Sequence, residues 1–238
     1  ICSLLRLQIL PGKSTLQRTM QKLKMKNILE VNKILLAEFL QRKINLLIDA
    51  SGIRIIGRSI WFSLKIKKQI SRRECDKIHL AVCSDVLFVM NWRISEGKKN
   101  DSPFFRLLVS PFRMLGLVVA DKGYSSRKNH QLTVDKKGAL FAPFKNNATG
   151  KSKSKPAWKI AFWIWQTYRT FYDGIYHQRS KIEAVFSALK KRYGDELYCR
   201  SVGMRRKEMA LRFVAYNIRL YLYWRYANEN GLNLYVRA

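Results

Sequence analysis

The sequence predicts an α/β protein, with a mixed sheet of about five strands flanked by helices and helical additions at both ends. Apolar runs of strand length alternate with stretches of helical periodicity, in the order strand, strand, strand, helix, strand, helix, strand, and then helices. Two of the apolar runs end in a single aspartate, which is followed by small residues in the first run and by a turn that contains glycine in the second. A hydrophobic content of 47% is enough to build a core around such a sheet.

The charge of the chain indicates its class of partner. Lys and Arg number 46 against 16 Asp and Glu, which gives a formal net charge of +30. A polyanion is the natural partner, because each phosphate that is neutralised releases counterions. A membrane surface is the competing partner, but the basic residues are spread along the chain instead of lying on one amphipathic helix. The sequence has no run of about 18 apolar residues, so we expect no membrane partner.

Two other kinds of site are excluded by spacing. The triplet at Gly12 ends like a phosphate-binding loop, but such a loop needs glycine five residues earlier, where Leu7 stands. The four cysteines lack the CxxC spacing of a zinc site, and we predict reduced thiols in a cytosolic protein. Because the chain begins at Ile1 within an apolar stretch, we expect that its true start is missing.

The first elements are a helical segment and a strand. A helix is predicted over residues 14–41 with Ser14 as its N-cap, and two helices that meet near residues 26–27 are the alternative. An apolar strand over residues 44–48 then delivers Asp49 at its end. The small residues that follow leave room for a phosphate and ions beside this carboxylate. A turn-forming aspartate is the alternative.

Two further strands are predicted over residues 53–68 and 77–90, and His79 is interpreted as a strand residue of the second. A helix follows, with Ser102-Pro103 in its N-cap and first positions. Asp101 stands just before this helix, and we interpret it as a loop or capping residue, not as a catalytic acid.

Residues 115–120 repeat the arrangement seen at Asp49. A fully apolar run ends in Asp121, and a turn that contains glycine follows. Two strand-end aspartates in one chain are more informative than either alone, because neighbouring parallel strands would bring both carboxylates to one edge of the sheet. A routine exit from strand to loop is the alternative.

The elements after Asp121 are assigned from composition and periodicity. The aromatic stretch among them is interpreted as a packed helix, with stacking on nucleic-acid bases as the alternative. The predicted elements are a short helix at 125–134, a fifth strand at 138–143, a basic connector at 145–155, an aromatic helix at 158–171, a basic turn at 200–207 and a long helix at 209–225.

The stretch from Tyr176 to Tyr193 is predicted to form one helix, since it contains neither Gly nor Pro. At about 100° per residue, four polar side chains fall within an arc of roughly 60°, beside an apolar stripe. The four are Tyr176, Arg179, Glu183 and Lys190. An ordinary amphipathic helix that carries an Arg–Glu pair on its solvated face is the alternative.

These four residues follow the order Tyr, two residues, Arg, three residues, Glu, six residues, Lys, which resembles the signature of insertion-sequence transposases of the DDE class. The sequence Asp-Lys-Gly-Tyr at Asp121 also resembles the setting of that family's second catalytic aspartate. Many members carry Asp where this chain has Cys83. The resemblance covers about residues 11–225 and implies a ribonuclease H-like core at 44–195 with a basic linker at 145–157, a helical N-terminal segment at 1–43 and a C-terminal helical extension at 196–238.

The resemblance also implies roles for individual side chains of this chain. Asp49, Asp121 and Glu183 are then the catalytic carboxylates, and they hold two Mg²⁺ or Mn²⁺ ions. The remaining residues of the signature are expected to contact DNA, with the arginine holding either the glutamate or a phosphate. These DNA-binding candidates are Tyr176, Arg179 and Lys190.

The function implied is metal-dependent cleavage of DNA at the ends of an insertion element, followed by strand transfer into target DNA. The expected partners are double-stranded DNA, as terminal inverted repeats and as target, and a second copy of the chain when DNA is bound. The expected location is the cytoplasm of a prokaryote, in association with the nucleoid. Two alternatives stay open: an inactive transposase remnant that only binds DNA, and a related ribonuclease H-like nuclease. Strand breakage that needs Mg²⁺ would separate the two enzymes from the remnant.

Overall fold

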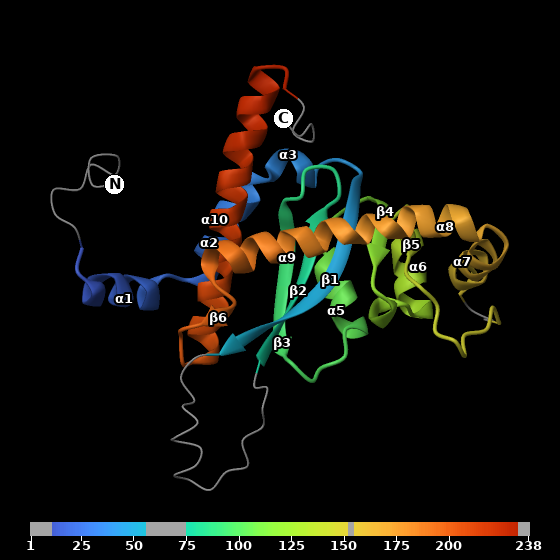
Figure 1. Ribbon diagram of the computed structural model, residues 1–238, viewed down its shortest axis with the longest axis horizontal. Helices are drawn as coiled ribbons and strands as arrows, with labels where there is room; N and C mark the ends of the chain where they lie inside the picture. Colours follow the sequence, from blue (N-terminus) through green and yellow to red (C-terminus); the bar gives the residue numbers. More distant parts are fainter. Residues whose placement is uncertain (1–10, 56–74, 152–154, 233–238) are drawn as a thin grey trace, which may run out of the picture.

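The computed structural model describes residues 11–55, 75–151 and 155–232. Its centre is a mixed sheet with helices on both faces (Figure 1). Within these ranges the sheet has six strands. They are β1 (Ile44–Ile55), β2 (Cys75–Cys83), β3 (Val89–Glu96), β4 (Leu115–Ala120), β5 (Ala139–Phe141) and the short β6 (Glu196–Leu197).

The strand order confirms the predicted class. Neighbouring strands follow the order β3-β2-β1-β4-β5, and β6 pairs with the far end of β1. β2 is antiparallel to both of its neighbours, β1 and β3, whereas β4 runs parallel to both β1 and β5. The protein is therefore an α/β protein with the mixed, ribonuclease H-like sheet that the sequence led us to expect.

The first strand is longer than predicted. β1 remains paired with β2 as far as Arg54, and Gly52 does not break it because its partner Lys77 keeps the ladder intact. Asp49 consequently lies inside β1, which corrects the prediction that it ends the strand. The strand predicted over 53–68 is wrong at its start, since residues 53–55 continue β1, and residues 56–68 lie outside the described part of the chain.

The single strand predicted over 77–90 is also wrong, because the chain turns back within it. β2 ends at Cys83, whose carbonyl accepts a hydrogen bond from the Leu87 N–H (2.9 Å) and whose N–H donates to the Phe88 carbonyl (2.9 Å). Leu87 adopts a positive φ of 60°, an uncommon conformation for a branched side chain. Its apolar neighbours gave the turn the appearance of a strand.

The helices differ from the prediction mainly at their ends. Ser14 lies inside the first helix, which has Gly12 in the N-cap position, and the helical segment breaks at residues 23–24 instead of 26–27. The helices are α1 (Lys13–Lys22), α2 (Met25–Leu35), α3 (Ala37–Leu40), α5 (Ser102–Val109), α6 (Arg127–Asp135), α7 (Pro156–Thr167), α8 (Arg169–Tyr176), α9 (Ser180–Tyr193) and α10 (Val202–Glu229), with 3₁₀ turns η1 (Lys122–Tyr124) and η2 (His177–Arg179).

Two of the later predictions need correction. The predicted basic turn at 200–207 is mostly helix, because the Ser201 hydroxyl accepts a hydrogen bond from the Met204 N–H and caps α10. The helix predicted over 176–193 is continuous in backbone conformation, but η2 separates the end of α8 from α9. No helix in the described part of the chain is both long and apolar enough to cross a membrane.

The two faces of the sheet are buried under different helices. Side chains of β1 alternate between them: Leu47 and Ile53 belong to the core that α9 and α10 cover, whereas Leu46 and Ile48 belong to the core that α5 covers. In Figure 1, α9 crosses the strands in front of the sheet and α10 stands at its left side. Both faces of β1 are therefore packed, and α9 is held over it by its own apolar side chains Ile182, Val185, Phe186 and Leu189.

Burial holds two histidines in the neutral form. His79 on β2 contacts the Tyr124 hydroxyl through Nδ1 (2.8 Å) and the Ser95 hydroxyl through Nε2 (2.9 Å). Burial lowers the pKa of His79 to about 4, although the charge of Asp101 opposes the change. Burial also lowers the pKa of His130, on α6, to about 4. Each histidine must therefore give up its proton when the chain folds near pH 6.

We predict that the free energy of unfolding falls as the pH drops from about 6.5 to about 4, because the unfolded chain then binds protons that the buried histidines do not. The variant His130→Phe keeps an aromatic ring against Phe144 and Trp158, and should remove roughly 3 kcal/mol of this pH dependence. Urea unfolding at several pH values measures the effect. Equal slopes for variant and wild type would contradict the assignment.

Candidate active site

Asp49 and Asp121 lie beside each other on neighbouring parallel strands. Ile48 of β1 is paired with Ala120 of β4, and the next residue along each chain segment is one of the two aspartates. β4 ends at Ala120, so Asp121 stands just beyond the strand, as predicted. Although Asp49 lies inside β1 and not at its end, the parallel pairing still brings both aspartates to the same part of the sheet.

The side chains of Asp49 and Ser51 both face α9. They have the same parity along β1 as Leu47 and Ile53, which pack against α9, and alternate residues of a strand point to the same face. The contacts agree with this placement: Asp49 binds Arg179 from η2, and Ser51 binds Lys190 from α9.

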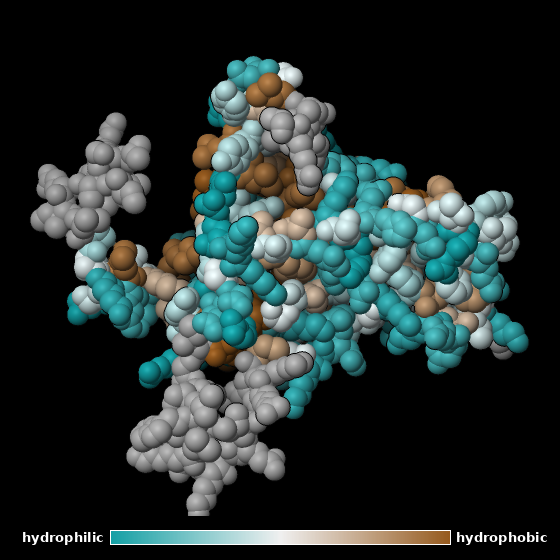
Figure 2. All heavy atoms as spheres, in the orientation of Figure 1, coloured by the Kyte–Doolittle hydropathy of each residue, from teal (hydrophilic) through white to brown (hydrophobic). Residues whose placement is uncertain are grey.

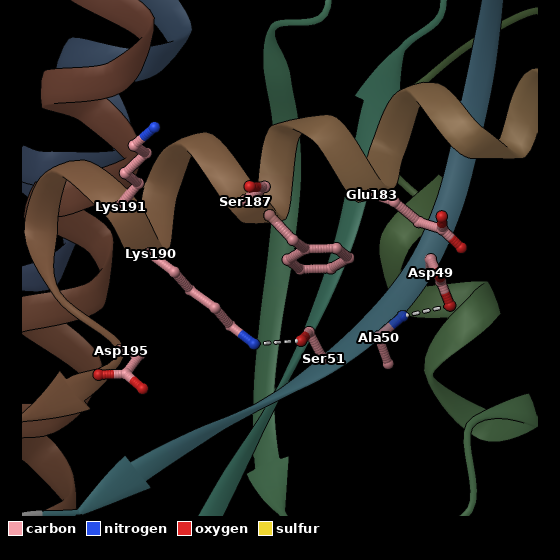
Figure 3. A pocket seen from close by; sticks show the side chains of 9 residues that line it. Asp49, Ala50, Ser51, Glu183, Ser187, Lys190, Lys191 and Asp195 are labelled. Carbon is pink, nitrogen blue, oxygen red and sulfur yellow. Dashed lines mark hydrogen bonds between the residues drawn. The ribbon is translucent and has the colours of Figure 1, made fainter.

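Arg179 joins two carboxylates that come from different elements. Its Nη1 lies 3.1 Å from Oδ2 of Asp49, and its Nη2 lies 2.9 Å from Oε1 of Glu183, one helical turn further on. Figure 3 shows Glu183 on the helix directed toward Asp49 on the strand that passes beneath it. The Glu183 side chain is 60% exposed and that of Asp49 only 15%, so the site opens from a partly buried aspartate to an accessible glutamate.

The pKa of Asp49 is raised above its ordinary value, chiefly by burial. The charges of Asp121 and Glu183 raise it further, whereas the Ala50 N–H, which donates to Oδ1 at 2.8 Å, and the Arg179 guanidinium both lower it. The charges of two other carboxylates thus act on Asp49 at this point of the sheet. A positive charge placed among them relieves both the burial of Asp49 and the mutual repulsion.

Tyr176 and Lys190 extend the site in opposite directions. Tyr176 ends α8, and its pKa is raised by burial first and then by the charges of Asp121, Asp49 and Glu183, against the effect of Arg179. The Lys190 ammonium donates to the Ser51 hydroxyl at 2.8 Å, about two helical turns beyond Glu183 (Figure 3). Tyr176 therefore lies close to the three carboxylates. Lys190 lies further along α9, the helix that carries Glu183.

An open groove of about 750 Å³ runs along this part of α9. Sequence reasoning missed several of its members. The two-residue period of β1 could have indicated Ser51, but the approach of Asp195 depends on the pairing of the distant strand β6 with β1. The groove is lined by Asp49, Ala50, Ser51, Glu183, Phe186, Ser187, Lys190, Lys191 and Asp195.

Asp101 and Cys83 do not line this groove, and neither do the candidate residues Asp121, Tyr176 and Arg179. Asp101 occupies the N-cap position of α5, but its side chain does not cap the helix and forms an ion pair with Lys77. Cys83, where the resemblance suggested an aspartate, is buried in the core beneath α5, and burial raises the pKa of its thiol. An apolar thiol suits that position, which faces away from Asp49.

The donor set suits a hard divalent ion, although the side chains are not gathered for one. Among the described residues, no group of three or more His, Cys, Asp and Glu side chains is close enough together to hold a metal. The chemistry of the site nevertheless fits, because carboxylate oxygens are the ligands that Mg²⁺ and Mn²⁺ prefer. The Arg179 guanidinium now supplies the positive charge between Asp49 and Glu183.

Comparison with known families decides the classification. The model of the transposase DDE domain family matches residues 41–218, which include the whole described sheet and every residue of the candidate site. The chain belongs to this family. The resemblance inferred from the spacing of Tyr176, Arg179, Glu183 and Lys190 is therefore confirmed at the level of the DDE transposase family.

One solved structure similar to this DDE-family chain is a piggyBac transposase, determined as a synaptic complex with hairpin DNA. The sequences are 12% identical, the TM-score is 0.46, and the match covers 81% of this chain. This chain spans about half of the piggyBac chain, of which 49% is covered. No curated protein matches the sequence significantly.

We predict that replacing Arg179 by glutamine raises the pKa of Asp49 further, because the nearest opposing positive charge is lost while burial is unchanged. A carbon-detected NMR titration of the Asp49 carboxyl group measures this shift. Arg54→Gln is the matched control, since Arg54 pairs with Asp195 and Glu196 at the other end of β1. A pKa that stays the same or falls in Arg179→Gln would contradict the charge balance described here.

Proposed function

We propose that this protein is a transposase that cleaves DNA at the ends of an insertion element and joins those ends to target DNA. One observation carries the proposal: in a chain of the DDE family, Asp49 and Asp121 each follow one residue of the pair Ile48–Ala120 on adjacent parallel strands, and Arg179 forms ion pairs with both Asp49 and Glu183. The partners would be double-stranded DNA, both as element ends and as target, and a second copy of the chain in the DNA-bound state.

Asp49, Asp121 and Glu183 would hold two Mg²⁺ or Mn²⁺ ions. When bound, such ions activate water or a DNA 3′-hydroxyl and stabilise the leaving oxygen of an in-line displacement. The protein's part is to keep the carboxylates ionised and correctly directed. The Ala50 N–H donates to one oxygen of Asp49, and this hydrogen bond and the Arg179 charge both oppose the rise in the pKa of Asp49 that burial causes.

The other residues of the signature would bind and orient DNA. Burial and the neighbouring carboxylates raise the pKa of Tyr176, so its phenol stays protonated and acts as a hydrogen-bond donor to phosphate, not as a nucleophile. The Arg179 fork suits a phosphate as well as it suits a carboxylate. Lys190, which donates a hydrogen bond to Ser51 at the groove, would contact the DNA backbone.

A second function, DNA binding without cleavage, is favoured by the ion pairs of Arg179. Because its guanidinium already neutralises Asp49 and Glu183, the chain has a stable arrangement of these acids that needs no metal. An inactive transposase remnant would bind DNA equally well with and without Mg²⁺ and would never break a strand. A ribonuclease H-like nuclease would break strands without joining them. Mg²⁺-dependent cleavage and strand joining therefore distinguish the three.

We predict that Asp49→Asn, Asp121→Asn and Glu183→Gln each lower the rate of Mg²⁺-dependent DNA cleavage by more than about 100-fold, because metal stabilisation of the transition state is worth several kcal/mol. DNA affinity should change little. The measurement is cleavage of a labelled duplex drawn from the DNA that flanks the gene, with binding followed by anisotropy.

Asp173→Asn is the matched control for these variants. Asp173 also forms an ion pair with an arginine, Arg169, at 2.7 Å, but it lies on α8 away from the groove. Its substitution should leave cleavage unchanged. Metal-dependent cutting that survives in any one of the three triad variants would reject the catalytic role of that residue.

We also predict that DNA affinity falls steeply with salt. A protein with about 6 to 10 phosphate contacts loses roughly a thousandfold or more in affinity between about 50 and about 200 mM salt, and a net charge of +30 supports contacts of that number. Hydrophilic side chains cover much of the face that carries α9 (Figure 2). Anisotropy titrations over this range measure the slope, and a flat response would argue against a polyanionic partner.

A further inference from the structure

Arg179 forms ion pairs with two of the three proposed catalytic carboxylates at the same time. Its two terminal nitrogens lie 3.1 Å from Asp49 and 2.9 Å from Glu183. We propose that Arg179 is an exchangeable internal cation: divalent ions displace it from these carboxylates, DNA phosphate draws it away, and metal binding is thereby coupled to DNA binding. This inference rests on the proposed function in one respect, that Asp49 and Glu183 are the metal ligands.

Asp49 needs a cation even before metal binds. The Asp49 side chain is only 15% exposed, and a buried carboxylate that lacks a partner is strongly destabilising. In the described part of the chain, the ion pairs of Asp49 and of Glu183 are both made by Arg179. The next cation along α9, Lys190, binds the Ser51 hydroxyl instead.

A guanidinium and a divalent ion cannot share these oxygens without cost. The two cations would compete for Oδ2 of Asp49 and Oε1 of Glu183, and like charges repel strongly in a partly buried site. Metal binding to the DNA-free protein must therefore break both ion pairs. That requirement lowers the affinity of the free protein for the ions.

A DNA phosphate offers Arg179 an equivalent partner. The planar fork of a guanidinium binds phosphate and carboxylate with similar geometry, and the Arg179 side chain is 24% exposed in the short turn between α8 and α9. Once Arg179 has moved to a phosphate, Asp49 and Glu183 are free for ions. By thermodynamic linkage, DNA then raises the affinity for metal by the same factor as metal raises the affinity for DNA.

The first arm of the test measures Mn²⁺ binding to the full chain without DNA, from the electron paramagnetic resonance signal of free Mn²⁺. We expect Arg179→Ala to bind Mn²⁺ about tenfold more tightly than wild type, within the usual range of coupling between sites. Arg54→Ala is the matched control and should not change the affinity, because Arg54 also pairs with two carboxylates, at 2.6 and 3.4 Å, but both lie outside the triad.

The second arm adds a short DNA duplex, with Mn²⁺ binding to the duplex alone subtracted. DNA should tighten Mn²⁺ binding to wild type and should do so far less in Arg179→Ala. Unchanged or weaker Mn²⁺ binding by Arg179→Ala in the first arm would overturn the proposal. Arg179→Gln, which retains more of the side-chain volume, repeats both arms if circular dichroism shows that the alanine variant is not folded.

The outcomes separate this inference from the proposed function. If wild type cleaves DNA with Mg²⁺ but Arg179→Ala gains no affinity for Mn²⁺, the coupling is overturned and the transposase function stands. If Arg179→Ala gains affinity that the added substitution Asp49→Asn removes, the exchange is supported even where wild type fails to cleave.

Discussion

The parallel pairing of β1 with β4 is the constraint on which the site depends. It places Asp49 and Asp121 beside each other whatever the helices do, because each follows a residue of one pair in the register. Both strands are buried between two layers of apolar side chains, so neither can slide without exposing its core. Two acids are thus brought together by packing, although their charges oppose the arrangement.

The third acid is added by a helix whose position has two independent supports. Apolar side chains of α9 pack on the sheet, and polar contacts fix its register: Arg179 binds Asp49, and Lys190 binds Ser51. Arg179 and Lys190 are eleven residues apart in the sequence, whereas their partners on β1 are two residues apart. The helix therefore crosses the strand obliquely, with both long side chains reaching back toward the crossing point, and Glu183 is left above Asp49.

The sequence was most informative where a local pattern coincided with the final geometry. The spacing of Tyr176, Arg179 and Glu183 identified a cluster that the structure brings together, and the apolar run before Asp121 identified the end of β4. It was least informative where tertiary pairing overrides local signals. Nothing local shows that β1 continues beyond Asp49, because that extension is stabilised by β2 and β6.

Turns within apolar runs were missed for a similar reason. The residues around Leu87 have the composition of a strand, and the hairpin there depends on a strained backbone conformation that composition does not reveal. Only one of the two ion pairs of Arg179 could be predicted from the sequence. The helical spacing indicated its pair with Glu183, but its contact with Asp49 spans 130 positions of sequence. Such a contact follows only once the sheet and α9 are assembled.

The excess of positive charge and the cluster of acids depend on each other. A net charge of +30 would draw a polyanion such as DNA to the surface, whereas Asp49, Asp121 and Glu183 would repel a phosphate that approached them. The partly buried Asp49 therefore needs a cation beside it. Arg179 meets this need in the DNA-free protein, and divalent ions would meet it when a phosphate takes the guanidinium. In this proposal the basic surface and the acidic site are coupled through Arg179, which pairs with the carboxylates without DNA and with a phosphate when DNA is bound.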